Sequence, residues 1–162
     1  MSDHVEIARH QHVPLRYVPR NLTKKDRVRQ LRELRKSRRM YRQGTYYVRR
    51  PVASYTRRRS KHVTRAMRIY GVSSMRPTAE LPQAMSGVDY VDLTKLARKT
   101  GCPLKDLKKI VNKGRGAYYS SGSRPNQTAD SWGYARLASA LTGGPAAKID
   151  RNLLTSCTKL KS

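Results

Sequence analysis

The chain has 162 residues, and its 36 Lys and Arg residues outnumber the 10 Asp and Glu residues, for a formal net charge of +26. Such an excess disfavours compaction unless another molecule neutralises it, so we expect an anionic partner: nucleic acid, lipid headgroups or an acidic protein surface. A hydrophobic fraction of 37% argues against one large core. No apolar run approaches the roughly 20 residues that cross a bilayer, and the first residues lack the apolar stretch of a signal peptide.

Residues 1–71 are predicted to form a basic arm. Between Arg20 and Tyr70 there are 19 Lys and Arg residues and only two acids, Asp26 and Glu33. Clustered cations bind phosphates without any sequence preference, although the same cations could form a solvated face or match acidic surfaces of a large assembly. Tyrosines beside arginines could also stack on unpaired bases. The interleaved tyrosines are Tyr41, Tyr46, Tyr47, Tyr55 and Tyr70.

A first helix is predicted within this arm, from Lys24 to about Arg42. Thr23 is expected to cap it and Gly44 to end it. Its apolar stripe is thin, so we expect the helix to depend on a partner for its order. The stripe consists of Val28, Leu31 and Leu34.

An extended segment, residues 45–52, and a second helix follow. Ser60 is expected to cap this helix and Gly71 to end it. One face of the helix would carry Val63, Met67 and Tyr70. Residues 72–87 contain prolines, serines and a glycine, and this composition predicts a linker.

Residues 88–162 are predicted to form a small helical domain, which makes the whole fold mainly α. We expect helices over residues 93–99, 103–113, 128–141 and 146–154, with Asp92 capping the first and Gly114 ending the second. The expected core consists of Leu93, Leu96, Leu104, Leu107, Ile110, Val111, Trp132, Leu137 and Leu141.

The first two of these helices have the spacing of a helix-turn-helix, because Gly101 permits a sharp turn between them. Lys105, Lys108 and Lys109 on the second helix could then meet DNA phosphates. A hairpin that only packs its own core needs the same residues, so both interpretations stay open.

Residues 114–128 are rich in Gly, Ser and Tyr and are predicted to form a loop that anchors the domain to a partner. Its backbone amides could instead cradle a phosphate, but it lacks the Lys-Ser/Thr ending of a nucleotide-binding loop. The residues expected to dock are Tyr118, Tyr119, Arg124 and Trp132.

No catalytic or metal site is predicted. Cys102 and Cys157 imply neither a disulfide framework nor a metal site, which fits synthesis in a reduced intracellular compartment. His4, His10 and His12 form a poor metal site without a carboxylate or a cysteine at suitable spacing. The ten acids are too scattered to nominate a general base. We therefore expect a non-enzymatic protein with no cofactor and no small-molecule substrate.

Two stretches carry a resemblance to a known family. The first, residues 16–38, contains RYVPRNLTKKD and QLRELRKSR; the second, residues 114–144, contains GRGAYYSSGSRPNQT, SWGYARL and TGG. Together they resemble an uncharacterised family of small basic proteins of large double-stranded DNA viruses, chlorella-virus-like and giant viruses included. The second stretch is also similar to segments of tailed-phage proteins. The resemblance covers roughly residues 16–150 and implies a virus-encoded protein that is packaged in the virion.

The resulting hypothesis is a minor capsid or cement protein, made in the host cell and located on the inner side of the capsid. Its partners would be capsid proteins, with DNA or an anionic membrane surface as a further partner. The alternative is a nucleic-acid-binding protein that condenses or packages the viral genome. The residues expected to bind the polyanion or partner are Lys24, Lys25, Arg27, Arg29, Arg32, Arg35, Arg38, Arg39, Arg57, Arg58, Arg59, Lys61, Lys105, Lys108 and Lys109.

Overall fold

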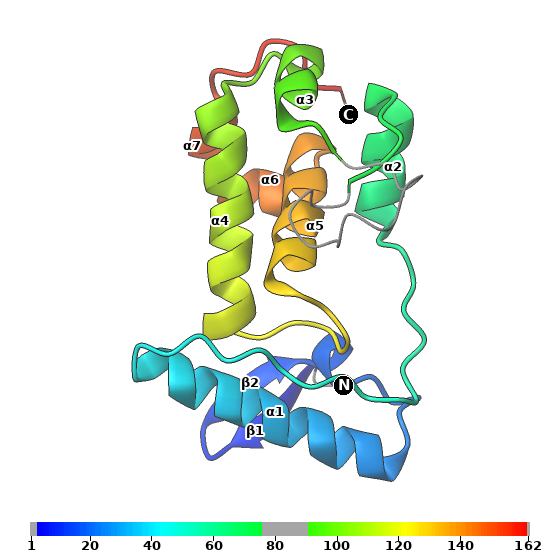
Figure 1. The fold of residues 1–162 in the computed structure, drawn as a ribbon, viewed down its shortest axis with the longest axis vertical. Helices are drawn as coiled ribbons and strands as arrows, with labels where there is room; N and C mark the ends of the chain where they lie inside the picture. The colour runs from blue at the N-terminus through cyan, green and yellow to red at the C-terminus, as the bar shows by residue number, and fades with distance from the viewer. Residues whose placement is uncertain (1–2, 76–90, 162) are drawn as a thin grey trace, which may run out of the picture. The chain divides into compact units, whose positions relative to one another are not determined.

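The computed structural model describes residues 3–75 and 91–161, and its fold is mainly α-helical, as predicted (Figure 1). Contacts divide the chain into two compact units. The first unit comprises the described residues of 1–58 and 116–129, and the second unit those of 59–115 and 130–162. The elements are β1 (His4–Ala8), β2 (Gln11–Pro14), a 3-10 turn (Leu15–Tyr17), α1 (Lys24–Arg42), α2 (Lys61–Tyr70), α3 (Leu93–Thr100), α4 (Leu104–Ser120), α5 (Ala129–Leu141), α6 (Pro145–Ile149) and α7 (Arg151–Leu154).

The two units do not follow the boundaries expected from composition. The first unit takes residues 116–129 from the predicted C-terminal domain, and the second unit takes α2 from the predicted basic arm. Composition misses this because long-range contacts, rather than charge density, decide which segments pack together. Residues 76–87 of the predicted linker lie outside the described residues.

An antiparallel hairpin opens the first unit, where no strand was expected. β1 pairs with β2 in a register that places Val5 opposite Val13, with an irregularity between Glu6 and Ala8. Ile7 and Val13 are buried, and β1 contacts α1. Both strands are short, so their alternation of apolar and polar residues is a weak signal.

Helix α1 begins and ends where the sequence predicts. The Thr23 hydroxyl accepts a hydrogen bond from the Asp26 amide at 3.2 Å, which satisfies one of the free N–H groups of the first turn. Gly44 adopts φ +80°, and the amides of Gly44 and Thr45 donate to the carbonyls of Tyr41 and Met40, both at 2.9 Å. This pair of bonds is a Schellman motif, and it fixes the direction in which the chain leaves the helix.

The apolar stripe predicted for α1 is wrong at one of its ends. Leu34 is fully buried and Leu31 half-buried, but Val28 is 53% exposed. The buried face is mostly polar, because the chain itself supplies hydrogen-bonding partners for it. The helix is therefore packed within the first unit, and its expected dependence on a partner for order stays a prediction. The buried residues of α1 are Asp26, Gln30, Glu33, Leu34 and Ser37.

The caps predicted for α2 and α3 are confirmed. The Ser60 hydroxyl accepts from the His62 amide at 3.3 Å, and the Asp92 carboxylate accepts from the first-turn amides of α3 at 2.9 and 3.1 Å. Gly71 and Gly101 end the two helices in the left-handed region, at φ +59° and +67°.

Helix α4 was predicted to end at Gly114, but it continues to Ser120. In the second unit, α4 lies beside α5 (Figure 1), and the two helices meet at glycines. A Cβ atom on Gly114 would lie 2.5 Å from the Cα of Gly133, and one on Gly133 would lie 2.5 Å from the carbonyl oxygen of Val111. Close packing is therefore the reason for Gly114, which costs about 1 kcal/mol of helix propensity.

Most of the predicted core lies where expected, in the second unit. The residues that are only half-buried stand at the beginnings of helices or on their sides, and these are Leu93, Leu104 and Trp132. The confirmed core residues are Leu96, Leu107, Ile110, Val111, Leu137 and Leu141.

The single last helix predicted for residues 146–154 is instead two short helices, α6 and α7, interrupted at Asp150. The Asp150 side chain is fully buried and forms ion pairs with Lys113 and with Arg136, whose Nε lies 2.8 Å from the carboxylate. Burial opposes ionisation of Asp150, but hydrogen bonds from Arg136 and Lys113 outweigh it and lower the pKa of this carboxyl.

Cys102 and Cys157 form a disulfide, although the sequence implied none. The bond ties the C-terminal segment to the turn between α3 and α4. The amides of Thr158 and Lys159 also donate to the carbonyls of Gly101 and Thr100, at 3.3 and 3.0 Å. The cysteines are 55 positions apart, so only the folded chain reveals their proximity.

Candidate polyanion-binding face

The two acids of α1, Asp26 and Glu33, both lie on its buried face. Glu33 accepts hydrogen bonds from the Tyr47 hydroxyl and the Arg50 amide, both at 2.8 Å. Asp26 accepts from the Ser54 amide at 2.8 Å, and hydrogen bonds from the Ser54 side chain and backbone lower the pKa of Asp26. The acids thus hold residues 47–54 against α1 and contribute no negative charge to the opposite side of the helix.

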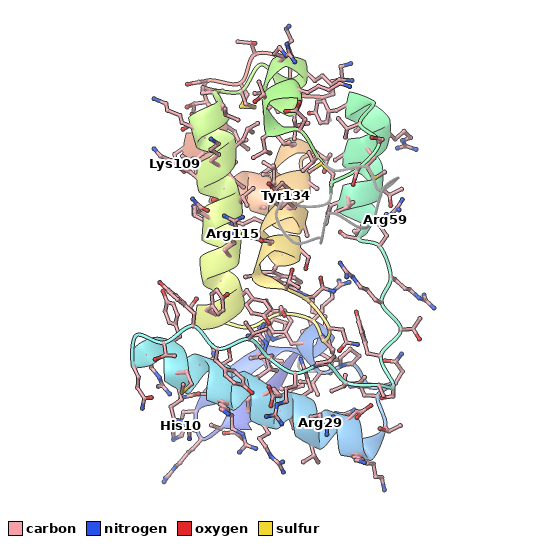
Figure 2. All side chains as sticks on the ribbon, viewed as in Figure 1. His10, Arg29, Arg59, Lys109, Arg115 and Tyr134 are labelled. Carbon is pink, nitrogen blue, oxygen red and sulfur yellow. A yellow bond between two sulfur atoms is a disulfide. The ribbon has the colours of Figure 1, made fainter. Side chains whose placement is uncertain are left out.

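That opposite side, which we call the outer face, carries seven cations and one apolar residue. At 100° per residue these positions span less than half of the circumference and lie across the helix from the buried residues. All eight side chains are exposed, and Figure 2 labels Arg29 among them. The outer face consists of Lys24, Lys25, Val28, Arg29, Arg32, Arg35, Arg39 and Arg42.

A shallow hollow of about 450 Å³ lies on the outer face at the first two turns of α1. Four cations surround it, and Val28 provides its apolar floor. Its lining residues are Lys24, Lys25, Val28, Arg29 and Arg32. A hollow of this kind accepts a compact anionic group, such as a phosphate, between long flexible side chains.

Two arginines predicted to bind do not belong to the outer face. Arg27 is half-buried. Arg38 donates from Nε to the Ser120 carbonyl and from a terminal nitrogen to the His12 carbonyl, both at 3.4 Å. Arg38 therefore ties α1 to the β-hairpin and to the end of α4 within the first unit.

The other predicted cations are exposed but lie elsewhere in the chain. Arg57 and Arg58 belong to the first unit, whereas Arg59 and Lys61 belong to the second. Lys105, Lys108 and Lys109 are exposed on α4, and Lys109 points away from α5 (Figure 2). Among the described residues, the largest group of predicted cations on one face is therefore the six on the outer face of α1.

The predicted docking loop is not a single loop. Tyr118 and Tyr119 lie in the last turns of α4, Arg124 is exposed in the loop that follows, and Trp132 is half-buried in α5. Tyr118 is 0% exposed, so it is a core residue of the first unit and is closed to a docking partner. The same helix accounts for the first half of the segment considered as a phosphate cradle, because its amides are used within α4.

Sequence reasoning missed Arg49, which is only 8% exposed. Its guanidinium donates to the hydroxyls of Ser37 and Ser123, both at 2.7 Å, and to the Tyr118 carbonyl at 2.6 Å. The guanidinium carbon also lies 3.8 Å from the centre of the Tyr118 ring, a cation–π contact. Burial lowers the pKa of Arg49 below its ordinary value. In a run so rich in arginine, no local pattern distinguishes this one from its exposed neighbours.

Within residues 3–75 and 91–161, no group of three or more His, Cys, Asp or Glu side chains is placed to hold a metal ion. None of the helices in the described part of the chain is long and apolar enough to cross a membrane. Positive charge on an exposed helix face is thus the strongest chemical feature of these residues.

Comparison with known proteins gives one positive result. Neither a curated protein nor a solved structure matches the chain. Residues 14–153 match a family model described as "Family of unknown function (DUF5824)". The match includes all of α1 to α6 and nearly all of α7, so the outer face and the Arg49 site both lie inside it. The chain therefore belongs to this family of unknown function.

Proposed function

We propose that the protein is a non-enzymatic binding protein that holds nucleic acid by its phosphates, through the outer face of α1. One observation carries this proposal: both acids of the helix are used on the buried face, so seven cations on the outer face have no acid among them. Solvated helix faces usually mix the two signs, whereas phosphate-binding faces carry one.

The dimensions of α1 suit a nucleic acid. Nineteen helical residues span about 28 Å. Double-stranded DNA carries one negative charge per about 1.7 Å of its axis, so this length of duplex offers about 16 phosphates. A membrane surface fits less well, because an interfacial helix needs an apolar face to bury and the outer face offers only Val28.

The resemblance to proteins of large double-stranded DNA viruses supplies a setting for this activity. We propose that the protein is a structural component of the virion, on the inner side of the capsid, where packaged DNA needs its charge neutralised. The minor capsid or cement role remains the second candidate. The capsid role was argued from an arm that gains its order on binding a partner. In the structure α1 packs against other residues of the first unit, and this packing supports the nucleic-acid role more.

The test removes two charges from the outer face and compares the result with the same loss elsewhere. The variant is Arg29→Gln with Arg32→Gln, and the control is Lys148→Gln with Arg151→Gln, whose side chains are exposed in the second unit. Fluorescence anisotropy with a labelled DNA duplex is measured over a range of salt concentrations. Each lost phosphate contact makes the log–log salt slope shallower by about 0.9, so we expect a change of about 1.8 in the variant and little change in the control.

Equal effects of the two variants would assign binding to net charge alone and remove the outer face from the proposal. A wild-type protein that binds neither duplex nor single-stranded DNA even at low salt would overturn it. Competition by polyglutamate that is stronger than competition by DNA would reassign the outer face to an acidic protein and support the capsid role.

A further inference from the structure

Two of the five tyrosines interleaved with arginines are exposed, one in the last turn of α1 and one just after the helix, and the structure separates them from the other three. Tyr47 donates its hydroxyl to Glu33, and the Lys36 ammonium lies 4.5 Å from the centre of its ring. Tyr55 is half-buried, and Tyr70 is buried in the second unit. The exposed pair is Tyr41, at 39% exposure, and Tyr46, at 70%.

The backbone holds Tyr46 in a defined place. The Schellman motif at Gly44 turns the chain directly after α1, so Tyr46 comes back beside the last turn. Its ring centre lies 6.2 Å from that of Tyr41 and 5.0 Å from that of Tyr119, with interplanar angles of 48° and 49°. These distances fall in the range of aromatic packing. The ring is thus supported by neighbouring rings, while most of its surface stays open to solvent.

The surroundings of this pair are positively charged. Arg39 and Arg42, the last cations of the outer face, lie in the same turn of α1 as Tyr41. The sequence contains no acid between Glu33 and Glu80, so the chain on either side of Tyr46 adds no negative charge. An aromatic ring that is supported, exposed and next to cations has the composition of a site that stacks a base while neighbouring cations bind its phosphates.

We propose that Tyr41 and Tyr46 form a stacking site for an unpaired base, so that the protein prefers single-stranded regions among the nucleic acids that the outer face of α1 can bind. The inference rests on the proposed function, because the outer face of α1 supplies the phosphate contacts. Bases inside a duplex are stacked on one another and offer no free face to a tyrosine. The site therefore selects single strands over duplexes of equal charge.

The test uses two oligonucleotides with the same number of phosphates, oligothymidine and an abasic oligomer. Fluorescence anisotropy gives the affinity of each for the wild-type chain and for Tyr46→Ala. Stacking of one base on an aromatic side chain contributes about a tenfold gain in affinity. We expect the wild type to prefer oligothymidine by roughly this factor, Tyr46→Phe to keep the preference, and Tyr46→Ala to bring the two affinities together.

Val48→Ala is the matched control. Val48 is 64% exposed in the same extended segment, so its truncation removes apolar surface but no ring. We expect this variant to keep the preference for oligothymidine. A loss as large as that of Tyr46→Ala would mean a general apolar contact, such as a protein partner makes, and would overturn the stacking site.

The outcomes separate this inference from the proposal beneath it. A wild-type chain that binds both oligomers equally, with strong salt dependence, would overturn the stacking site and leave phosphate binding intact. A wild-type chain that binds neither would overturn both. Tyr46 is mostly exposed, so far-UV circular dichroism of Tyr46→Ala should match that of the wild type, which keeps the comparison valid.

Discussion

Arg49 has a role opposite to that of the other arginines of the basic arm. It is buried inside the first unit and donates to two serine hydroxyls and to the Tyr118 carbonyl. The phenol of Tyr118 also accepts a hydrogen bond from the Arg49 amide at 3.2 Å. The Arg49 side chain thus links its own extended segment both to α1 and to the end of α4, which lies 69 positions further along the chain.

Replacing Arg49 should therefore destabilise the first unit. We expect Arg49→Met to lower the free energy of unfolding by about 2–4 kcal/mol, because the substitution leaves buried oxygens without donors and removes the cation–π contact. Urea denaturation monitored by circular dichroism measures the change. The neighbouring Arg50 is exposed, so Arg50→Met should stay within about 0.5 kcal/mol of the wild type. Similar losses for both variants would contradict the structural role of Arg49.

At the scale of elements, the sequence predicts the helix boundaries that depend on local chemistry. Thr23, Ser60 and Asp92 are caps in the structure as in the sequence, because a short polar side chain satisfies the first amides of a helix wherever the helix packs. Gly71 and Gly101 end helices for an equally local reason, their left-handed backbone.

Most of the features that the sequence does not predict depend on contacts between segments that lie apart in the sequence. The hairpin of residues 4–14 is too short for a clear periodicity. The buried face of α1 is polar, whereas the sequence predicts an apolar stripe. The prediction fails because the hydrogen-bonding partners Tyr47, Arg50 and Ser54 lie in an irregular segment after the helix. Six of the seven cations of the candidate site were named from composition, and Arg42 was missed. Their separation from Asp26 and Glu33 emerges only once the buried face of α1 is known.

Helix α4 contains two glycines that should respond to substitution in opposite directions. A Cβ on Gly114 meets the backbone of α5, whereas nothing lies within 4 Å of a Cβ on Gly116. We expect Gly114→Ala to lower the free energy of unfolding by about 1–3 kcal/mol through overpacking. Gly116→Ala should raise it by about 0.5–1 kcal/mol, because alanine favours the helix. Thermal unfolding of the two variants tests this, and stabilisation by Gly114→Ala would contradict the close contact between the helices.

At the scale of the whole molecule, most of the acids form interactions within the chain that stabilise its fold. Within the described residues, six of them accept hydrogen bonds from the chain itself: Glu6, Asp26, Glu33, Asp92, Asp130 and Asp150. Each binds a backbone amide, a hydroxyl or a cation close to it. The surplus cations therefore find little compensation within the chain, and under the proposed function a bound polyanion would relieve their repulsion.

The buried carboxylate of Asp150 makes stability depend on pH in a defined direction. Its folded pKa is lowered below the ordinary value of 3.8, so the stabilisation is fully present above that value and is lost as pH falls through the folded pKa. We expect the free energy of unfolding to decrease below about pH 4. Asp150→Asn should lower the free energy of unfolding by about 2 kcal/mol at neutral pH. The loss is not larger because Lys113 is partly exposed and solvent weakens its ion pair. The variant should also lose less stability than the wild type as the pH falls.

Urea denaturation at several pH values measures this decrease in stability at acid pH. Asp26 also has a lowered pKa, so Asp150→Asn should leave a smaller acid dependence rather than none. If the decrease in stability at acid pH is the same in Asp150→Asn as in the wild type, the ion pairs with Arg136 and Lys113 contribute nothing to the pH dependence.

The bond between Cys102 and Cys157 makes the covalent structure of the chain depend on its redox surroundings. A crosslink of this kind persists in oxidising surroundings and opens where glutathione keeps thiols reduced. In reducing surroundings the chain would carry two thiols, and hydrogen bonds alone would hold the C-terminal segment to the turn between α3 and α4. Transfer to more oxidising surroundings would add the covalent tie. The state of this bond would then show which surroundings a copy has reached.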